Sequence, residues 1–480
     1  MNTPTKAAAE IAISTLSARA PHAQSLANAF AKAGFRLALV GGPVRDAILG
    51  KLSTDLDFTT NARPEDTKKI LNLWADSIWD TGIQFGTVAG KKDDITVEVT
   101  TYRSEKYDVN SRKPEVNFGD DIAGDLARRD FTVNAMALEL TTKEPEFIDP
   151  FNGVMDLAKK VLRTPRKAEE LFTDDPLRMM RAARFASQLK FDVDPTIITA
   201  IENMADRISI VSAERVRDEF IKILMSDNPR IGITMMVDTG LADLVIPEIP
   251  KLRLEVDEHH HHKDVYEHSL MVLEQAMADE ERLGGPNLII RLTALLHDIG
   301  KPKTRELIPG GGVSFHHHEV VGARLTKERL RKMRFDKETI EAVSELVFLH
   351  LRFHGYGSGE WTDSAVRRYI RDAGAYLVHL HVLTRADCTT RNKRKAEILA
   401  HTYDQLEIRI AELMAAEELS KIRPDLDGNQ IMEILGVKGR TVGSAYQHLL
   451  DLRMEHGPLG EERAKAELLN WWREHQRENS

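Results

Sequence analysis

Short apolar or alternating segments occur only in the first third of the chain, where they predict β-strands. Glycine, aspartate and lysine residues bound each segment, as expected where strands end in turns. Helical patterns separate the strands over 43–50, directly after a double glycine, and over 63–77, where Pro64 suits the first turn of a helix. The predicted strands are 36–42, 55–60, 85–90, 95–102 and 131–140.

Beyond residue 155 the apolar positions follow an almost uniformly helical spacing. The pattern therefore predicts an α/β head followed by a long all-α remainder. A chain of 480 residues is also too long for one hydrophobic core. At roughly 150 residues per domain, it suggests about three domains.

The composition is that of a globular protein, with 42% hydrophobic and 29% charged residues, and not that of a disordered or fibrous one. No stretch approaches the roughly 18 apolar residues of a membrane span, and the N-terminus lacks a secretory signal pattern. The single cysteine, Cys388, excludes an internal disulfide and fits a reducing cytoplasm. We expect Cys388 to be a buried structural residue.

The net charge of −9 argues against nucleic-acid binding along the whole chain, but net charge conceals local patches. Two basic clusters stand out, and each could be a solvated helix face or a binding surface. The histidines are also uneven, because 13 of 18 fall between His259 and His381, which marks a region with its own chemistry. The clusters are Lys159, Lys160, Arg163, Arg166 and Lys167, and Arg391, Lys393, Arg394 and Lys395.

Acidic residues on two predicted strands suggest a metal-dependent site. On an extended strand, Asp55 and Asp57 project from one face and Leu56 from the other. Glu98 likewise projects opposite its valine neighbours. Three carboxylates on adjacent strands can hold two Mg²⁺ ions about 4 Å apart. Any one of these acids alone would more simply be a solvent-facing strand residue.

A double glycine, Gly41 and Gly42, ends the first predicted strand where a helix begins at Pro43. Glycine permits close approach of a phosphate to the backbone, and the free N–H groups at a helix start attract anions. Taken alone, the pattern also fits a plain tight turn.

In combination, GGPVRD, DLD, the later glutamate and RRDFTVNA resemble the polymerase β superfamily of nucleotidyltransferases. More narrowly, they resemble the bacterial-type (class II) tRNA CCA-adding enzymes and their relatives, the bacterial poly(A) polymerases. The resemblance extends from about residue 20 to about residue 460. It implies an α/β nucleotidyltransferase head with a polymerase β-like palm, followed by all-α regions.

The resemblance also implies roles for individual residues. Asp55 and Asp57 match the metal-binding pair, and Glu98 is similar to the third, catalytic carboxylate. Segment 149–153 matches a hinge between the head and the neck. The residues implied to contact the triphosphate or the ribose are Gly41, Gly42, Arg45, Asp46, Arg128, Arg129, Asp130 and Asn134.

The segment DDPLRMMRAARF bears on the choice of nucleotide. Asp175 and Arg178 lie three apart in a helical pattern, so they are expected to share a helix face, which Arg181 and Arg184 continue. Cytosine and adenine both present an amino donor beside a ring-nitrogen acceptor, whereas guanine and uracil present a carbonyl beside an N–H. An Asp acceptor beside an Arg donor therefore suits C and A and leaves buried polar groups unpaired with G or U. A simple helix salt bridge would explain the same spacing.

The same segment resembles the family's amino-acid template, EDxxR, with Asp174 in place of Glu. The departure is expected to matter little, because the second acid and the Arg contact the base in the family. The following motif, VSAERVRDEF, contains three residues expected to brace the neck without touching substrate. They are Glu214, Arg215 and Glu219.

The histidine-rich region contains an H…HD…D order, with the HD pair at the end of an apolar helix. Imidazole and carboxylate ligands suit Mn, Fe, Ni or Mg, and the absence of cysteine argues against a structural zinc cluster. The order resembles the HD phosphohydrolase superfamily. In related nucleotidyltransferases it implies phosphatase or 2′,3′-cyclic phosphodiesterase activity, although the fold could also survive as a scaffold. The expected ligands are His268, His297, Asp298 and Asp387, with His318 and His350 as further candidates for a second metal or substrate phosphate.

The tail contains a glycine-rich turn around 437–443, which would present backbone N–H groups to a phosphate backbone. Contact with tRNA through shape and backbone is the expected mode for an RNA helix. The regions implied by the resemblance are a head over 1–150, a neck and body over 151–255, an HD domain over 256–390 and a tRNA-binding tail over 391–480. The residues predicted to bind RNA are Lys159, Lys160, Arg391, Lys393, Arg394, Lys438 and Arg440.

The resemblance therefore implies an enzyme that adds CCA to tRNA from CTP and ATP with Mg²⁺ and without a nucleic-acid template. Residues 80–84 lack the basic run of the family's poly(A) polymerases, and the charged segment 102–126 is not shortened as it is in CC-adding relatives. An A-adding enzyme or a poly(A) polymerase of the same family remains an alternative. So do an HD phosphohydrolase with an RNA-binding head and a tRNA chaperone without chemistry.

Overall fold

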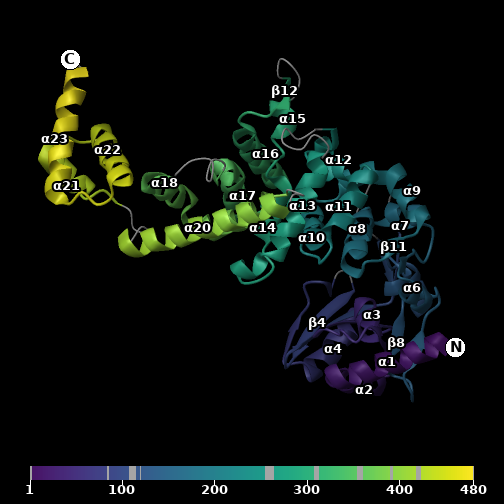
Figure 1. Cartoon of the computed structure of the whole chain (residues 1–480). Coiled ribbons are helices and arrows are strands. Elements are labelled where there is room, and N and C mark those ends of the chain that lie inside the picture. The colour runs from purple at the N-terminus through teal and green to yellow at the C-terminus, as the bar shows by residue number, and fades with distance from the viewer. Residues whose placement is uncertain are drawn as a thin grey trace. The chain divides into compact units, whose positions relative to one another are not determined.

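The computed structural model describes residues 3–83, 86–106, 115–118, 121–254, 264–307, 313–353, 361–389, 393–417 and 423–478 (Figure 1). The chain divides into two compact units, Met1–Pro247 and Glu248–Ser480. No helix in the described part of the chain is long and apolar enough to span a membrane.

The first unit contains a mixed seven-stranded sheet in the order β3-β4-β5-β2-β1-β8-β9. β2 and β5 pair in parallel, and the other neighbours pair antiparallel. β6 (Arg103–Lys106) and β7 (Glu115–Phe118) form a separate antiparallel pair. The strands of the sheet are β1 (Leu37–Val40), β2 (Asp55–Thr60), β3 (Ser77–Trp79), β4 (Thr87–Lys92), β5 (Ile95–Thr101), β8 (Ala137–Glu139) and β9 (Glu146–Ile148).

The main core of the head joins one face of the sheet to its covering helices. Leu39, Leu56 and Phe58 are fully buried in this cluster together with Leu26 and Phe30 of α2. A smaller cluster containing Val40 and Tyr102 lies on the other face. The alternation of β2 therefore leaves Asp55 and Asp57 exposed while Leu56 and Phe58 are buried. The helices of the head are α1 (Thr3–Arg19), α2 (His22–Lys32), α3 (Gly42–Ile48), α4 (Pro64–Trp74) and α5 (Ile122–Ala127).

The rest of the first unit is helical, apart from the two-residue strands β10 (Val161–Leu162) and β11 (Asp192–Val193). α8 packs against both α10 and α11, and this packing brings side chains of α8 and α10 to one side of the head. The helices are α6 (Gly153–Lys159), α7 (Ala168–Asp174), α8 (Leu177–Leu189), α9 (Pro195–Met204), α10 (Ala213–Leu224), α11 (Pro229–Asp238) and α12 (Leu241–Val245).

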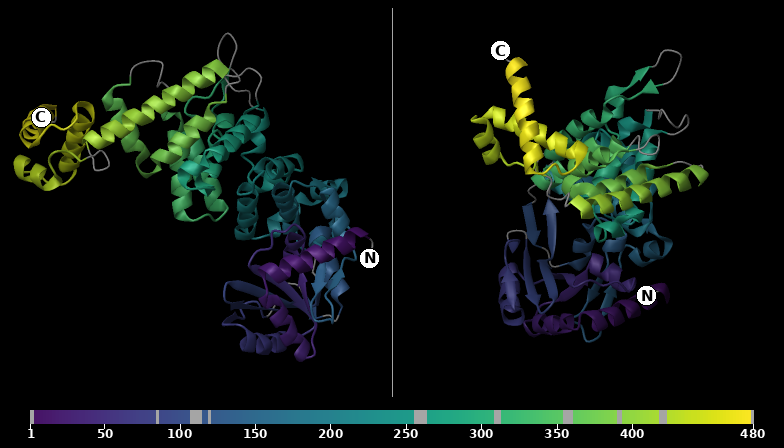
Figure 2. Two further views of the ribbon diagram at one scale, coloured as in Figure 1. Left: turned by 60° about the horizontal axis from the view of Figure 1, so that its bottom comes forward. Right: turned by 60° about the vertical axis from the view of Figure 1, so that its left-hand side comes forward.

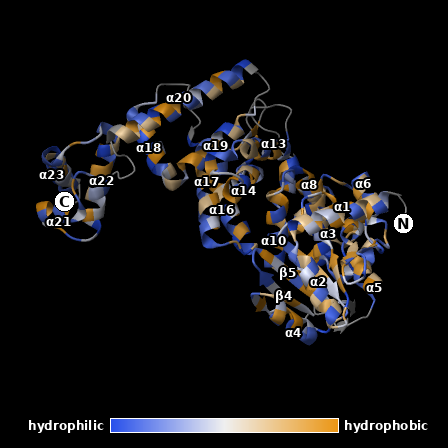
Figure 3. Ribbon diagram, turned by 90° about the horizontal axis from the view of Figure 1, so that it is seen from below, coloured by the Kyte–Doolittle hydropathy of each residue, from blue (hydrophilic) through white to orange (hydrophobic). Residues whose placement is uncertain are grey.

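The second unit is built almost entirely of helices, as two further views show (Figure 2). In it, α13 packs against α14 and α19, and α16 packs against α17. Hydrophobic and hydrophilic residues alternate around the helices, as expected for amphipathic segments (Figure 3). The elements are α13 (Val265–Ala278), α14 (Leu288–Leu296), α15 (Lys301–Thr304), β12 (Glu306–Leu307), β13 (Val313–Ser314), α16 (His318–Lys332), α17 (Lys337–Leu349), α18 (Asp363–Ala373), α19 (Leu377–Asp387), α20 (Lys393–Glu417), α21 (Gly428–Leu435), α22 (Arg440–His456) and α23 (Glu461–Glu478).

The predicted strand over 131–140 is wrong in its first half. Thr132–Asn134 form a 3₁₀ turn, and only Ala137–Glu139 are extended in the sheet. One oxygen of Asp130 accepts hydrogen bonds from the N–H of Phe131 at 2.8 Å and from the side-chain amide of Asn134 at 3.0 Å. These local side-chain bonds compete with strand pairing. The other four predicted strands correspond to β1, β2, β4 and β5, whereas the three-residue strands β3 and β9 are too short to produce a pattern.

Candidate active sites

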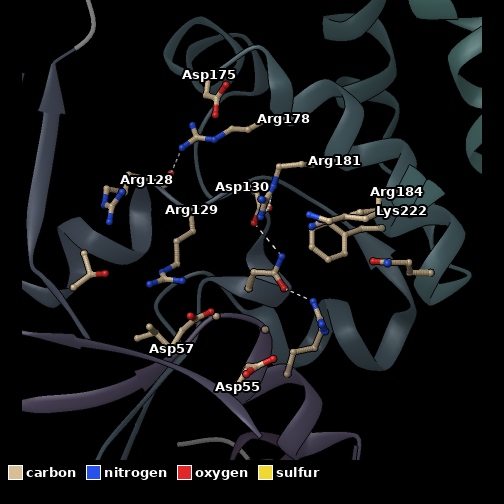
Figure 4. Close-up of a pocket in the computed structure, with 18 of the residues that line it drawn as sticks. Asp55, Asp57, Arg128, Arg129, Asp130, Asp175, Arg178, Arg181, Arg184 and Lys222 are labelled. Atoms are coloured by element: carbon tan, nitrogen blue, oxygen red, sulfur yellow. Dashed lines mark hydrogen bonds and ion pairs between the residues drawn. The ribbon is translucent and has the colours of Figure 1, made fainter. Parts of the chain in front are cut away.

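A cavity of about 910 Å³ opens between the sheet of the head and helices α8 and α10 (Figure 4). Its volume lies in the range of small-molecule and cofactor sites. All the head and neck residues that the sequence assigned to catalysis or nucleotide binding line it, except Asp46 and Glu98. The lining residues among them are Gly41, Gly42, Arg45, Asp55, Asp57, Arg128, Arg129, Asp130, Asn134, Asp175, Arg178, Arg181 and Arg184.

The acidic edge of the cavity comes from the parallel pair β2 and β5. The register places Asp57 beside Glu98, and Asp55 lies two residues away on the same face of β2. The cavity walls withdraw the Asp57 carboxylate from bulk water and raise its pKa; Arg129 offsets part of this rise and Asp55 adds to it. Partial burial raises the pKa of Glu98, and Asp57 and Asp55 raise it further. These carboxylates repel one another, and a bound cation would relieve the repulsion. Carboxylate oxygens are also the hard ligands that Mg²⁺ prefers.

The double glycine forms a turn that other residues could not form without strain. Gly41 has φ = 74°, and a Cβ atom there would lie 2.7 Å from the guanidinium of Arg129. The helix α3 begins at Gly42; Pro43 has no N–H and the N–H groups of Val44 and Arg45 donate to the carbonyl of Gly41, so the N–H of Gly42 is the one in this turn left for a ligand in the cavity. Arg45 donates a 2.6 Å hydrogen bond to Asn134 and also pairs with Asp46.

Asp130 is the buried centre of a polar network that joins the head to α8. It forms an ion pair at 2.5 Å with Arg181 and accepts a hydrogen bond from Asn134. Burial opposes its ionisation, but Arg181, Asn134 and Arg178 together hold the pKa of Asp130 at about 2. The ring of Phe185 lies against three guanidinium groups of the same wall. Their Cζ atoms are 5.3 Å (Arg45), 5.7 Å (Arg181) and 4.3 Å (Arg184) from its centroid.

Replacing Asp130 by asparagine should lower the free energy of unfolding by about 2–3 kcal/mol at pH 7, because Arg181 would lose its buried counter-charge. Because the pKa of Asp130 is held at about 2 in the folded protein, its ionisation contributes about 2 kcal/mol to the free energy of unfolding above pH 4. This contribution is lost as the pH falls through 2. Urea unfolding followed by circular dichroism should therefore show a difference between wild type and Asp130→Asn that shrinks by about 1 kcal/mol at pH 3. Asp218→Asn, at an exposed pair with Arg217, is the control. An equal difference at pH 7 and pH 3 would contradict this account.

The structure corrects the placement of Asp175. It follows the end of α7 and precedes α8, which begins at Leu177, so Asp175 and Arg178 do not share one helix. Both side chains nevertheless line the same end of the cavity (Figure 4). Asp175 pairs with Arg215 at 2.8 Å and accepts a hydrogen bond from the N–H of Leu177 at 3.1 Å.

Arg178 is held by the backbone of two regions. It donates hydrogen bonds to the carbonyls of Leu171 at 3.0 Å and Arg128 at 2.5 Å. Asp174 lies 3.9 Å from Arg178 and pairs with Arg166 at 2.6 Å. The candidate base-reading groups are therefore fixed both by the neck and by the RRDFTVNA segment of the head.

Three residues that α8 and α10 contribute to the cavity wall were not predicted from the sequence. Phe185 and Gln188 continue the spacing of three to four residues that begins at Arg178 on α8, and this spacing could have identified them. Lys222 lies on α10, far along the chain, and only the packing of α10 against α8 brings it to the cavity. Of the residues expected to brace the neck, Arg215 contacts Asp175, and Glu219 pairs with Arg184 at 3.1 Å.

In the second unit the predicted metal ligands form two adjoining groups. The ligand atoms within each group lie within 4.8 Å of one another. Asp298 lies between the groups: one oxygen is 3.2 Å from Nε2 of His297 and the other is 3.3 Å from Nε2 of His318. The same oxygen that faces His297 lies 3.6 Å from Nε2 of His268, so the four expected ligands lie together and the two further candidates adjoin them through the other oxygen of Asp298. The groups are His268, His297 and Asp387, and Asp298, His318 and His350.

Backbone contacts orient the imidazoles of this centre. Nδ1 of His297, His318 and His350 lies 2.9, 2.8 and 2.7 Å from the backbone carbonyl three residues earlier in each case. An Nδ1–H donated to a carbonyl leaves Nε2 with a lone pair, and the Nε2 atoms of His318 and His350 face each other at 3.2 Å. The four imidazoles and two buried or half-buried carboxylates are therefore a donor set that fits divalent cations.

Two further residues shape this centre. A Cβ atom on Gly300 would lie 2.1 Å from the carbonyl oxygen of His318, so glycine is required where the segment after the HD pair crosses the start of α16. Lys301 places its Nζ 2.8 Å from Asp298. Burial lowers the pKa of His297, but the charges of Asp298 and Asp387 raise it to about 9, so a divalent cation must displace a proton from this imidazole when it binds. Neither Gly300 nor Lys301 was predicted from the sequence to belong to this centre.

The residues predicted to bind RNA are exposed wherever the structure describes their side chains. Lys159 and Lys160 are exposed at the end of α6, and Lys438 and Arg440 are exposed between α21 and α22. Arg394 is exposed on α20, whereas Arg391 and the side chain of Lys393 lie outside the described residues. Cys388 is half-buried at the end of α19, so the expectation of full burial is wrong.

Three protein families match separate segments of the chain, and the two candidate sites fall in different segments. Residues 37–163 match the family "Poly A polymerase head domain", residues 190–252 match "Probable RNA and SrmB- binding site of polymerase A", and residues 265–392 match "HD domain". The fold and the cavity thus define a protein with a nucleotidyltransferase head and an HD domain.

Relatives place the chain more narrowly. An A-adding tRNA nucleotidyltransferase from Deinococcus radiodurans is 32% identical and covers 90% of this chain and 95% of its own length. A CCA-adding enzyme from Lactobacillus johnsonii is 39% identical over 46% of this chain and 53% of its own length. This CCA-adding enzyme and four others are matched over only 50–55% of their own length. The chain belongs to the bacterial tRNA nucleotidyltransferase family whose members include CCA-adding and A-adding enzymes.

Solved structures share the fold. A Bacillus stearothermophilus CCA-adding enzyme in complex with CTP matches with a TM-score of 0.67 at 22% identity, over 100% of both chains. A Thermotoga maritima CCA-adding enzyme complexed with tRNA matches with a TM-score of 0.58 at 18% identity, over 94% of both chains. These matches confirm the predicted α/β head followed by helical regions.

Proposed function

We propose that this protein is a CCA-adding tRNA nucleotidyltransferase, which builds or repairs the 3′-terminal CCA of tRNA from CTP and ATP without a nucleic-acid template. The observation that carries the proposal is the composition of one cavity. It combines an acidic strand edge, a cationic wall and the Asp175–Arg178 end within about 910 Å³. The relatives named CCA-adding enzymes support the same reaction.

The reaction is a transfer of a nucleotidyl group. The 3′ hydroxyl oxygen of the tRNA forms a bond to the α-phosphorus, the bond to the β-phosphate breaks, and pyrophosphate leaves while the hydroxyl proton is released. Two Mg²⁺ ions held by Asp55, Asp57 and Glu98 would lower the pKa of the attacking hydroxyl and neutralise the leaving pyrophosphate. Arg45 and the N–H of Gly42 at the start of α3 bind the triphosphate.

The nucleotide is selected by Asp175 and Arg178. An Asp acceptor and an Arg donor match the amino group and ring nitrogen shared by cytosine and adenine. Guanine and uracil would leave both side chains facing groups of the same polarity. Arg215 and the carbonyl of Arg128 hold the two readers in place, which limits their freedom to rearrange for a wrong base.

The tRNA lies along basic surfaces of the neck and tail. Lys159, Lys160, Arg394, Lys438 and Arg440 are exposed and would contact phosphates rather than bases. The chain would then have four parts: a head and an HD domain that carry out the reactions, and a neck and body and a tail that contact the tRNA. The single cysteine fits a cytoplasmic location.

The second unit would carry a metal-dependent phosphohydrolase. The paired groups around Asp298 support it, because two adjacent divalent cations can bind a phosphate and generate a hydroxide nucleophile. The resemblance implies a phosphatase or 2′,3′-cyclic phosphodiesterase, which would clean damaged RNA ends before nucleotide addition.

A second candidate for the head is an enzyme that adds only the final A. The relative matched over 95% of its own length is an A-adding tRNA nucleotidyltransferase, and this observation favours the alternative. The cavity does not distinguish CCA addition from A addition, because the same residues would bind cytosine and adenine.

The test incubates the purified protein and Mg²⁺ with tRNA that ends at the discriminator base, at -C or at -CC. CTP, ATP or both are supplied and the 3′ ends are sequenced. Addition of C, C and A that then stops supports CCA addition. Addition of A only to the -CC end indicates an A-adding enzyme, and long A tails indicate a poly(A) polymerase. No incorporation into any end would overturn the proposal.

A further inference from the structure

One carboxylate at the α8–α10 side of the cavity serves two cations. Glu219 pairs with Arg184 at 3.1 Å and with Lys222 at 3.4 Å. The neighbouring cations of the wall each have a carboxylate of their own, Asp130 for Arg181 and Asp46 for Arg45. The pair Arg184 and Lys222 therefore brings an excess of positive charge to the cavity.

The charge of Arg184 is buried, which is energetically unfavourable unless an anion lies beside it. The residue is only 8% exposed, and its Nε has no hydrogen-bond partner among the residues that the structure describes. Burial lowers the pKa of Arg184 to about 10, and the nearby charge of Arg181 contributes. A buried N–H of a charged side chain that lacks a partner is expected at a site where a bound ligand supplies the acceptor.

The position of this pair is separate from the candidate base-reading end. Six residues along α8 separate Arg178 from Arg184, or about 9 Å at 1.5 Å per residue. Arg184 and Lys222 lie side by side, on the other side of the Asp130–Arg181 pair from Arg128 (Figure 4). About half of the Lys222 side chain is exposed, so its ammonium group is accessible from the cavity.

We propose that Lys222 and Arg184 form a second phosphate-binding subsite of the cavity, with Gln188 at its edge. The inference rests on the proposed nucleotidyl transfer, which brings two phosphate-bearing substrates together. The phosphate belongs either to the end of the incoming triphosphate or to the last phosphodiester of the tRNA acceptor. Lysine binds such a group as a point charge, and Arg184 adds a directed N–H from Nε.

The experiment measures binding and kinetics of Lys222→Met, which keeps the aliphatic stem. We expect an affinity about ten- to hundredfold weaker for one phosphate-bearing substrate, the range for loss of a charged hydrogen bond. CTP binding is measured by calorimetry, and binding of tRNA ending at -CC by filter retention. Lys222→Arg should recover most of the loss. Arg217→Met on the same helix is the matched control, because Arg217 pairs with the exposed Asp218 and does not line the cavity.

The outcomes separate the two phosphate sources. Weaker binding of CTP alone assigns the subsite to the triphosphate, weaker binding of tRNA alone assigns it to the acceptor, and weaker binding of both assigns it to a position that the two share. Unchanged affinities and KM values for both would overturn the proposal and make Lys222 a partner of Glu219 only. A thermal unfolding midpoint equal to that of wild type shows that the fold is kept. Absence of incorporation by wild type would refute the proposed function, whereas the binding ratios alone decide the subsite.

Discussion

Replacing Asp57 by asparagine should lower kcat for nucleotide incorporation on the order of 10³-fold or more. Asparagine preserves the shape of the side chain but removes the charge that divalent cations require. Asp57 lies opposite Glu98 in the parallel pair of β2 and β5, and Asp55 lies two residues away on the same face of β2. Asp55 is the other acid of that edge among the cavity-lining residues, but it would supply its own carboxylate to the cations and so cannot also replace Asp57.

Incorporation of radiolabelled CTP into tRNA that ends at the discriminator base measures this effect. Asp80→Asn is the control, because Asp80 is an exposed acid that pairs with Lys68. The hydrolytic activity of the HD centre should remain at the wild-type level, since its ligands belong to the other compact unit. Incorporation within tenfold of wild type would show that Asp57 is not a metal ligand.

Replacing Asp298 by asparagine should abolish both metal binding and hydrolysis in the HD centre. Asp298 contributes one oxygen to each side of the paired groups, at 3.2 Å from His297 and 3.3 Å from His318. A neutral amide cannot bridge two cations, and the loss should reduce hydrolysis of 2′,3′-cyclic AMP to background, at least about 10³-fold. Metal content after dialysis is measured by mass spectrometry, and CCA addition should continue.

A second variant keeps this prediction testable if Asp298→Asn folds poorly. His318→Asn removes a ligand of only one group and should lower the metal content while His268, His297 and Asp387 remain. Asp336→Asn is the control, because this exposed acid caps α17 through Thr339. Full metal content in both variants would mean that these groups are not the metal centre and that the HD fold serves as a scaffold.

The local pattern of the sequence was sufficient for the residues that act within one element. The alternation of β2 put Asp55 and Asp57 on one face, because successive strand side chains point to opposite sides. The double glycine was assigned correctly to a strand–helix turn, because Gly41 has φ = 74°. The motifs also indicated the family, which the comparison with a relative over 90% of the chain confirmed.

The same kind of reasoning failed where polar side chains override a backbone pattern. Asp130 converts the first half of the expected strand over 131–140 into a 3₁₀ turn. Pro176 follows Asp175, and the chain between α7 and α8 turns there, so the two candidate base-reading residues come from different positions of the backbone. Such interruptions depend on hydrogen bonds that a hydrophobic period does not contain.

The sequence by itself determined the class of fold, the acidic strand edge, the arginines of α8 and the types of ligand in the HD centre. Only the tertiary structure decided which distant residues share a site. Lys222 reaches the cavity because α10 packs on α8, and Asp298 joins two groups because Gly300 lets the HD segment cross α16 closely. Helix and strand periods fix which face a side chain occupies within its own element, whereas the meeting of faces depends on packing between elements far apart in the chain.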